Sequence, residues 1–353
     1  MSNNLNSQQK AALKYIDGPL LVLAGAGSGK TSVITQKIAY LVEQCDIPAR
    51  NIAAVTFTNK AAREMKARVF KLMPKDKSRG LTVSTFHNLG LNIIRTELKT
   101  LGFKPGFSIL DQEDCRKLLK ELMVRHSELD DKLLDQVQST ISNWKNSLLE
   151  PGQATGAADS TGEQGIAMLY ERYQRALKAY NAVDFDDLIM TPVMLFKQHS
   201  DILNKWQRRI RYLLVDEYQD TNLAQYELVR NLVNEKQALT VVGDDDQSIY
   251  AWRGARPENL MQLQTDFPGL EIIKLEQNYR STGRILHAAN TLIDNNPHLI
   301  SKQLWSELGP GDPLRLISAE NEEDECERVV SEIIDMRLTR RCKYSDFAIL
   351  YRG

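Results

Sequence analysis

The sequence has 353 residues, of which 42% are hydrophobic and 26% are charged, and its formal net charge is −1. The length predicts two or three globular domains, and the near-neutral charge argues against a protein that coats nucleic acid through bulk positive charge, although a local basic groove remains compatible with it. No run approaches the ~18 apolar residues of a membrane span, and there is no signal-peptide pattern. The four cysteines have no CxxC spacing, so neither a zinc site nor a disulfide framework is expected, and a reducing cytoplasm is the expected compartment.

The first part of the chain alternates apolar strand patterns with a helical pattern. Residues 20–24 form an apolar run that ends in a glycine-rich turn, and from Lys30 apolar residues recur at helical spacing. Residues 52–57 and 81–85 are β-branched runs typical of buried strands. Strand, helix and strand in this order predict a parallel, doubly wound α/β sheet.

A mainly helical insertion is expected between two parts of this sheet. Residues 88–200 are rich in Leu, Lys, Glu and Gln at helical spacing, with a small, polar stretch at 151–165 that is expected to be a flexible loop. Strand patterns resume at 211–216, 238–243 and 271–275.

Two more strands are expected at residues 314–318 and 347–351. A domain of two or three strands is too small to bury a good core. The chain is therefore expected to stop inside a second, incomplete α/β domain.

The glycine-rich turn after the first predicted strand has the composition of a phosphate-binding loop. Its residues are Ala24, Gly25, Ala26, Gly27, Ser28, Gly29, Lys30 and Thr31. Glycines let backbone N–H groups close around phosphate, and the N-terminus of the following helix adds positive potential. Lys30 is predicted to reach the β- and γ-phosphates of a nucleoside triphosphate and Thr31 to bind Mg²⁺. The alternative is a structural turn that carries Gly-Lys-Thr by chance.

Two carboxylates, Asp216 and Glu217, follow the predicted strand at 211–216. Ligands of open α/β sheets bind at the carboxyl ends of the strands. The chemistry needs one acid to hold Mg²⁺, predicted as Asp216, and a second to orient and deprotonate the attacking water, predicted as Glu217. Alone, Asp-Glu after an apolar run is more often a solvated strand end; with the phosphate-binding loop, the catalytic interpretation is favoured.

Polar and aromatic residues follow the strand pattern at 238–243. Gln247 is predicted to hydrogen-bond the γ-phosphate or the attacking water. Tyr250 and Trp252, next to Arg253, make a platform for unstacked bases. Composition alone leaves open the alternative that these two rings lie on one face of a core strand.

Two more short patterns contain candidate residues. Phe57 precedes Thr58 and Asn59 and is a stacking candidate, although by itself it is better explained as core. At residues 278–280, Tyr279 is a candidate for stacking on adenine and Arg280 for neutralising charge on the γ-phosphate.

As a set, these residues resemble the motifs of superfamily 1A DNA helicases, the UvrD/PcrA/Rep family. The matching blocks are residues 24–31, 56–62, 85–87, 215–220, 243–253 and 277–280, and the likeness extends to residues 141–146 and over essentially the whole chain. The resemblance implies two RecA-like domains that clamp ATP, with single-stranded DNA crossing above them and 3′→5′ translocation.

The resemblance also implies residue roles and domain ranges. Gln9 is expected to read adenine, Tyr279 to stack on it and Arg280 to contact the γ-phosphate. The residues expected to contact the DNA strand are Phe57, Asn59, His87, Phe185, Tyr250, Trp252 and Arg253. The expected domains are a first RecA-like domain (1–86 plus 198–278), a helical insertion (87–197) and the start of a second RecA-like domain (279–353).

The implied protein is an ATP- and Mg²⁺-dependent 3′→5′ DNA helicase or translocase that works in replication, fork restart or repair. Single-stranded DNA and 3′-tailed or forked duplexes are its expected substrates, replisome or restart proteins its expected partners, and a cytoplasmic monomer or DNA-induced dimer its expected state. Ser32 departs from the pattern, because close relatives carry Arg near the nucleotide at that position. Two alternatives remain: a motor fragment that binds ATP and DNA with little turnover, and the motor part of a helicase–nuclease subunit.

Overall fold

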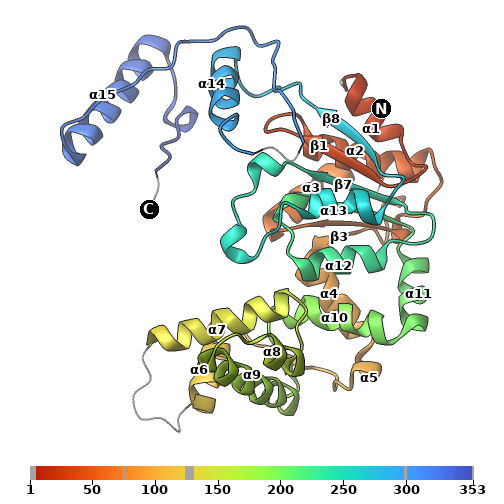
Figure 1. Ribbon diagram of the computed structural model, residues 1–353. Coiled ribbons are helices and arrows are strands. Elements are labelled where there is room, and N and C mark those ends of the chain that lie inside the picture. The colour runs from red at the N-terminus through yellow and green to blue at the C-terminus, as the bar shows by residue number, and fades with distance from the viewer. Residues whose placement is uncertain (1–4, 75, 124–130, 298–299, 352–353) are drawn as a thin grey trace.

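A computed structural model describes residues 5–74, 76–123, 131–297 and 300–351. In this part of the chain, six strands form one parallel sheet in the order β3-β2-β6-β7-β1-β8 (Figure 1). They are β1 (Leu20–Ala24), β2 (Ile52–Thr56), β3 (Thr82–Thr85), β6 (Tyr212–Val215), β7 (Leu239–Gly243) and β8 (Glu271–Leu275). The predicted doubly wound parallel sheet is confirmed, with strand ends that differ from the expected bounds by at most a residue or two.

Apolar residues on alternate strand positions bury the two faces of the sheet separately. Leu20 and Val22 pack into one core, which is covered by α1 (Ser7–Lys14), α2 (Lys30–Glu43) and α3 (Asn59–Leu72). Leu21 and Val241 pack into the other. That face is covered by α4 (Phe86–Thr96), α10 (Asp187–Gln198), α11 (Ser200–Arg209), α12 (Leu223–Leu232) and α13 (Asn259–Asp266). Because every strand is parallel, all their carboxyl ends meet at one edge.

A mainly helical body lies below the sheet in the view of Figure 1 and has its own core. It contains α5 (Leu98–Leu101), α6 (Gln112–Met123), α7 (Asp131–Asn146), α8 (Pro151–Ala157), α9 (Thr161–Ala179) and the short parallel pair β4 (Ser108–Ile109) and β5 (Ala182–Val183). The prediction of a flexible loop at residues 151–165 is wrong. Pro151 starts α8 behind a capping box from Glu150, and the Ser160 side chain caps α9.

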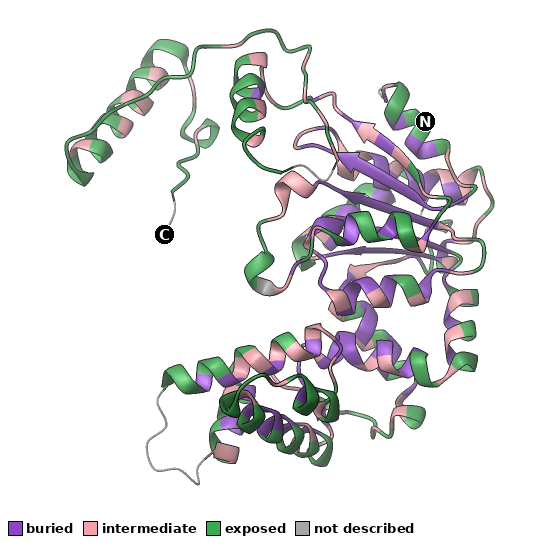
Figure 2. Ribbon diagram, in the orientation of Figure 1, coloured by how far each residue is buried: buried purple, intermediate pink, exposed green. Residues whose placement is uncertain are grey.

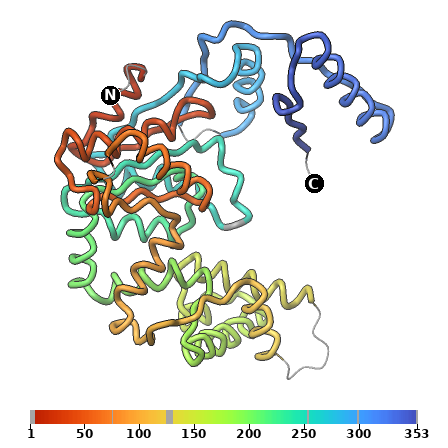
Figure 3. Tube along the Cα trace, turned by 180° about the vertical axis from the view of Figure 1, so that it is seen from behind, coloured from red at the N-terminus to blue at the C-terminus, as the bar shows by residue number. Residues whose placement is uncertain are grey.

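The strands expected at residues 314–318 and 347–351 are also absent from the described chain. Those residues form no regular element and are mostly exposed, with Leu316 at 95% and Leu350 at 93% exposure (Figure 2). Apolar β-branched residues favour a strand only where another strand and a packed face accept them. This part holds α14 (Gly283–Ile293), α15 (Glu322–Arg340) and the 3-10 turn η5 (Tyr344–Asp346), and the view from behind shows it running away from the sheet (Figure 3).

None of the described helices is both long and apolar enough to cross a lipid bilayer.

Candidate active site and adjoining groove

The glycine-rich turn closes on itself between β1 and α2. Gly27 and Gly29 have left-handed backbones with φ of +72° and +89°, which glycine adopts without steric cost. The Ser28 hydroxyl donates to the Gly25 carbonyl at 2.7 Å, and no described side chain caps α2. The turn therefore presents a helix N-terminus at the carboxyl edge of the sheet, which is the geometry that binds phosphate.

Lys30 brings together the loops that follow three strands. Its Nζ lies 3.1 Å from Glu217 Oε2, after β6, and 3.2 Å from Gln247 Oε1, after β7. The Lys30 side chain is 11% exposed. A bound triphosphate would compete with these two oxygens for the ammonium group, so phosphate binding would change the contacts of both predicted catalytic residues.

Asp216 and Glu217 occupy different environments although they are adjacent. Burial, and after it the charge of Glu217, raise the pKa of Asp216 to about 7. The Glu217 backbone is left-handed, with φ of +52°, a conformation that costs energy outside glycine. That conformation turns the Glu217 side chain toward Lys30, while Asp216 stays buried at 6% exposure.

Gln219 connects the ends of β6 and β7 and was missed from the sequence. Its Nε2 donates to Glu217 Oε2 at 3.0 Å, and its Oε1 accepts the backbone N–H of Asp244 at 3.0 Å. It stands two residues beyond Glu217 in the same motif block, but its partner is on another strand, which sequence spacing does not reveal.

Thr31 and Asp216 offer the hard oxygen ligands that Mg²⁺ prefers. Thr31 lies in the first turn of α2, and Asp216 lies at the end of β6, next to the Glu217 contact with Lys30. The residues at this edge therefore fit a magnesium triphosphate, with the phosphates over the turn and Asp216 and Thr31 available to the cation.

The expected adenine residues lie on the other side of the turn. Gln9 is 3% exposed, and its Nε2 donates to the Ser28 carbonyl at 2.9 Å. Gln277 Oε1 accepts from the Tyr279 hydroxyl at 2.9 Å and from Asn6 Nδ2 at 3.1 Å. Because Gln9 also forms a capping box with Asn6, these residues make one connected group. Tyr279 is 47% exposed, so its ring has a face available to a base.

Asn278 holds the segment that carries Tyr279 and Arg280 against the phosphate-binding turn. Its Nδ2 donates to the Ala26 carbonyl at 2.6 Å, and its Oδ1 accepts the backbone N–H of Arg280 at 2.8 Å. The backbone N–H of Tyr279 donates to Gly27 at 3.0 Å. Arg280 is exposed beside the turn. No sequence signal separated Asn278 from its neighbours as the anchoring residue.

A groove of about 1000 Å³ lies between the sheet and the helical body. All five rings expected to contact DNA line it: Phe57, His87, Phe185, Tyr250 and Trp252. They come from the end of β2, from α4, from the turn after β5 and from the segment after β7. The groove is thus built by segments that are far apart in the sequence.

The rings in the groove contact one another in pairs. His87 and Phe185 meet edge to face with centroids 5.9 Å apart, and Tyr250 and Trp252 lie 6.4 Å apart. Burial lowers the pKa of His87. Aromatic faces in a groove are suited to stacking with unpaired bases.

The alternative of a core strand for Tyr250 and Trp252 is wrong. They flank and enter a 3-10 turn, η4 (Ala251–Arg253), and are 38% and 73% exposed. Phe57 fits both of its interpretations, since it packs against the buried Phe86 at 5.4 Å and also lines the groove.

Two residues expected at the DNA strand are not placed in the groove. Asn59 starts α3, where its Oδ1 accepts from Asn88 Nδ2 at 3.2 Å, and it is not among the described lining residues. The side chain of Arg253 lies outside the described part of the chain.

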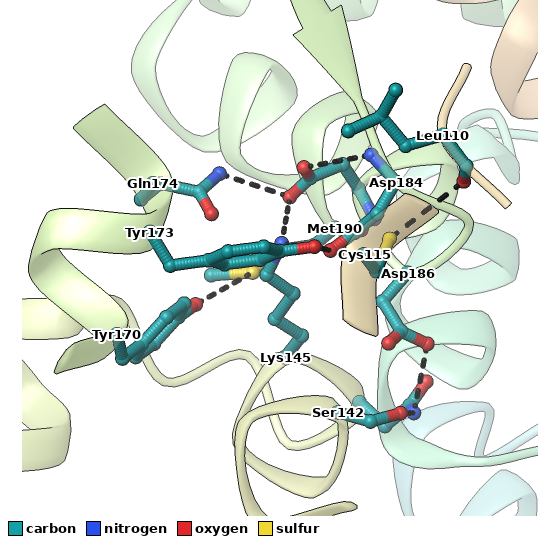
Figure 4. A network of polar contacts seen from close by, with 12 residues as sticks. Leu110, Cys115, Ser142, Lys145, Tyr170, Tyr173, Gln174, Asp184, Asp186 and Met190 are labelled. Carbon is teal, nitrogen blue, oxygen red and sulfur yellow. Dashed lines mark hydrogen bonds and ion pairs between the residues drawn. The ribbon is translucent and has the colours of Figure 1, made fainter. Parts of the chain in front are cut away.

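Phe185 is exposed and lies in a turn whose acids form a network of polar contacts with Lys145, Tyr173 and Gln174 (Figure 4). The Lys145 side chain is fully buried, and its Nζ lies 2.6 Å from Asp184 and 2.8 Å from Asp187, the carboxylates on either side of the turn. Tyr173 donates to Asp184 at 3.0 Å and Gln174 to Asp187 at 3.0 Å. The acids were visible in the sequence beside Phe185, but their cation comes from another helix.

A contact also joins this turn to the sheet. Asn146 Nδ2 donates to Asp186 Oδ1 at 3.1 Å, and Asn222 Nδ2 donates to Asn146 Oδ1 at 2.7 Å. Asn222 follows the carboxylate segment after β6. Hydrogen bonds therefore connect the end of that segment with the Phe185 turn.

Comparison with known families gives two matches that together span nearly the whole chain. Residues 5–268 match the UvrD/REP helicase N-terminal domain, and residues 273–353 match the UvrD-like helicase C-terminal domain.

Curated relatives agree with these matches. The chain is 56% identical over 349 residues to the ATP-dependent DNA helicase Rep of Escherichia coli (strain K12), with 99% of this chain and 52% of that protein covered. It is 49% identical over 350 residues to Rep of Buchnera aphidicola subsp. Acyrthosiphon pisum (strain APS), covering 99% and 54%. It is 44% identical over 354 residues to the ATP-dependent DNA helicase PcrA of Leuconostoc citreum, covering 100% and 47%. The chain thus spans about half the length of these relatives.

Proposed function

Because the chain belongs to the UvrD/REP helicase family, we propose that it is the motor part of an ATP-dependent DNA helicase that moves 3′→5′ along single-stranded DNA. The observation that supports this most strongly is the convergence on Lys30, with Glu217 at 3.1 Å and Gln247 at 3.2 Å, beside a groove lined by aromatic rings. A phosphate-binding edge and a base-stacking groove on one sheet are what a strand-moving ATPase requires.

The proposed domain division follows the same reasoning. Residues 1–86 and 198–278 would form the first RecA-like domain, residues 87–197 the helical insertion and residues 279–353 the start of the second RecA-like domain. The sheet and the separate core of the helical body support a division into two bodies, but α4 and α10 fall largely within residues 87–197 and pack on the sheet.

In the proposed mechanism, Lys30 binds the β- and γ-phosphates and gives up its contacts with Glu217 and Gln247. Glu217 then accepts a proton from the attacking water, and Gln247 orients that water or the γ-phosphate. Arg280 neutralises charge that develops on the γ-phosphate. When bound, Mg²⁺ supplies positive charge to the phosphate oxygens, and Thr31 and Asp216 are the residues that would hold it.

The same segment after β7 would transmit the state of the nucleotide to the DNA. Gln247 lies at its start and contacts Lys30, while Tyr250 and Trp252 follow and line the groove. A shift of Gln247 on phosphate binding would therefore move rings that stack on bases. Phe57, from the sheet, and Phe185, from the helical body, would contact the bases of the DNA strand.

We propose single-stranded DNA and 3′-tailed or forked duplexes as substrates, because the relatives are named as DNA helicases. Replication, fork restart or repair in the cytoplasm would be the setting, with replisome or restart proteins as partners and a monomer or DNA-induced dimer as the working form.

The proposal is tested by two substitutions that should separate the nucleotide site from the groove. Lys30→Met should lower ATP hydrolysis by at least ~100-fold, because one preorganised charge on the reacting group is typically worth that much, while oligothymidylate affinity stays within about twofold. Trp252→Ala should weaken oligothymidylate binding by about 5- to 150-fold, as expected for loss of one stacked base.

Lys178→Met and Tyr180→Ala, exposed positions on and just after α9, serve as matched controls. Undiminished ATP hydrolysis in Lys30→Met, or unchanged DNA affinity in Trp252→Ala, would contradict the proposal.

A further inference from the structure

Lys302 forms a cluster with three consecutive carboxylates that follow β7. Its Nζ lies 2.6 Å from Asp244 Oδ1, 2.8 Å from Asp245 Oδ1 and 2.5 Å from Asp246 Oδ2. The Lys302 side chain is 4% exposed, and the three acids are 3%, 5% and 14% exposed in the same order. The sequence showed the acids, but not the lysine that neutralises them from more than fifty residues away.

The three carboxylates need a cation at this point. One oxygen from each lies within 4.8 Å of the others, and charged groups removed from water are costly unless a counter-charge pairs with them. Lys302 supplies positive charge to all three acids and so connects residues 244–246 to its own segment.

The segment that carries Lys302 is fixed against the nucleotide site. Leu304 packs on Gly25 so closely that a Cβ on this glycine would lie 2.3 Å from Leu304 Cδ2. The backbone N–H of Asn278 donates to the Trp305 carbonyl at 2.7 Å, and Lys274 Nζ donates to the Ser301 carbonyl at 2.6 Å. Residues 300–305 therefore touch both the phosphate-binding turn and the segment of the expected adenine residues.

From Lys302, contacts continue to the predicted catalytic residues. Gln247 Nε2 donates to Asp244 Oδ2, and Gln247 Oε1 accepts from Lys30 at 3.2 Å. Asp244 is thus shared between Lys302 and Gln247. The same segment continues into Tyr250 and Trp252, which line the groove.

We propose that Lys302 is a positioning residue: it ties residues 300–305 to Asp244–Asp246 and so sets the arrangement in which Gln247 responds to the γ-phosphate and the Tyr250–Trp252 pair meets DNA. This inference rests on the proposed function. Its consequence is that loss of Lys302 removes the coupling between nucleotide and DNA binding, while each ligand still binds alone, because Lys302 does not line the groove and its described ion pairs are with Asp244–Asp246.

The test measures that coupling in the 353-residue chain. The dissociation constant of a fluorescent oligothymidylate is measured with and without Mg²⁺ and a non-hydrolysable ATP analogue, and the ratio of the two values is the coupling factor. Couplings between sites are typically about 5- to 150-fold. The wild type should show a factor in this range, and Lys302→Met should show a factor below about twofold, with each ligand alone binding within about threefold of wild type.

Lys302→Arg should keep most of the coupling, because a guanidinium also pairs with carboxylates. Lys274→Met is the matched control, since Lys274 contacts the same segment at Ser301 but none of the three acids, and it should couple normally. If Lys302→Met unfolds, a triple variant, Lys302→Met with Asp245→Asn and Asp246→Asn, reduces the cluster to the single carboxylate of Asp244, which Gln247 still contacts; it should also lose coupling.

The outcomes separate the two proposals. If the wild type binds neither ligand, the proposed function fails. If the wild type binds both ligands without coupling, or if Lys302→Met or the triple variant couples like the wild type, the inference about Lys302 is overturned while the proposed function stands. A third outcome would also overturn the inference: Ca²⁺ restores coupling in Lys302→Met, and Lys302→Arg does not couple. The three acids would then act as a cation site.

Discussion

Asp216 and Glu217 show how two adjacent carboxylates acquire different properties. Burial raises the pKa of Asp216 to about 7, whereas Glu217 is turned by its left-handed backbone toward Lys30 and Gln219. Without a cation, Asp216 is therefore poised to gain or lose a proton near neutral pH. Mg²⁺ requires the ionised form, so its binding would release that proton.

Replacement of Asp216 should change how stability depends on pH. The folded-state pKa of about 7 lies above the unfolded value of ~3.9, so the folded chain binds more protons between these two values. The contribution of Asp216 to the free energy of unfolding is fully present below pH ~3.9. It is lost as the pH rises to about 7, with a slope of up to about 1.4 kcal/mol per pH unit. Asp216→Asn should lack that part of the slope in urea unfolding without divalent cations.

The difference in stability between the wild type and Asp216→Asn reports on Asp216 alone, because the other acids titrate in both proteins. The stability of Asp216→Asn relative to wild type should therefore increase from pH 4 to pH 7 and then level off. A constant difference across this range would show that Asp216 titrates normally, and the described environment would be wrong.

At the same scale, the sequence predicted residues that belong to short motifs and missed residues that are identified only by a partner from a distant segment. Lys30, Asp216 and Glu217 belong to short motifs with a known chemical requirement, and the structure places them at one sheet edge. Lys145 and Lys302 each neutralise acids from a separate segment. A lysine in a sequence gives no sign of burial, because its counter-charge is found only after folding.

The turn between β1 and α2 combines backbone freedom with close packing. Gly29 has φ of +89°, and a Cβ placed on it would lie 2.8 Å from Gln9 Nε2. Gln9 in turn donates to Ser28 in the same turn. The element thus requires glycine both for its conformation and for the approach of α1.

Gly29→Ala should destabilise the chain by about 1–2 kcal/mol from the left-handed backbone alone, and more if Gln9 is displaced. Gly165→Ala is the control, because Gly165 lies inside α9 with no atom near the added methyl group, and it should stabilise by about 0.5–1 kcal/mol. Urea unfolding measures both. Equal effects of the two substitutions would mean that the turn is not held in the described conformation.

Prediction of elements succeeded where burial is decided by the local pattern. The strands of the sheet are buried runs and were predicted nearly to the residue. Residues 151–165 were mistaken for a loop because their glycines and small polar residues outweighed two capping signals, Pro151 after Glu150 and Ser160 before Glu163. Residues 314–318 and 347–351 have strand composition, but in the described chain they have no sheet to join.

Over the whole molecule, the two proposed sites share the carboxyl edge of a single sheet. The nucleotide residues come from the ends of β1, β6, β7 and β8, and the groove begins where β2 and the segment after β7 meet the helical body. The family likeness predicted the residues of both proposed sites, but the groove could not be predicted from spacing, because its walls come from segments in both bodies. Two ligands bound at one edge can influence each other through the segments they share.

Hydrogen–deuterium exchange of the 353-residue chain, with each ligand added separately, tests this arrangement most directly. The Mg²⁺ complex of a non-hydrolysable ATP analogue should protect residues 25–31 and 278–280, and oligothymidylate should protect the groove segments around Phe57, Phe185 and Trp252. Each ligand should also alter exchange in residues 244–253. This arrangement would be contradicted if the nucleotide protected the groove without changing exchange at residues 25–31, or if DNA left exchange in the groove segments unchanged.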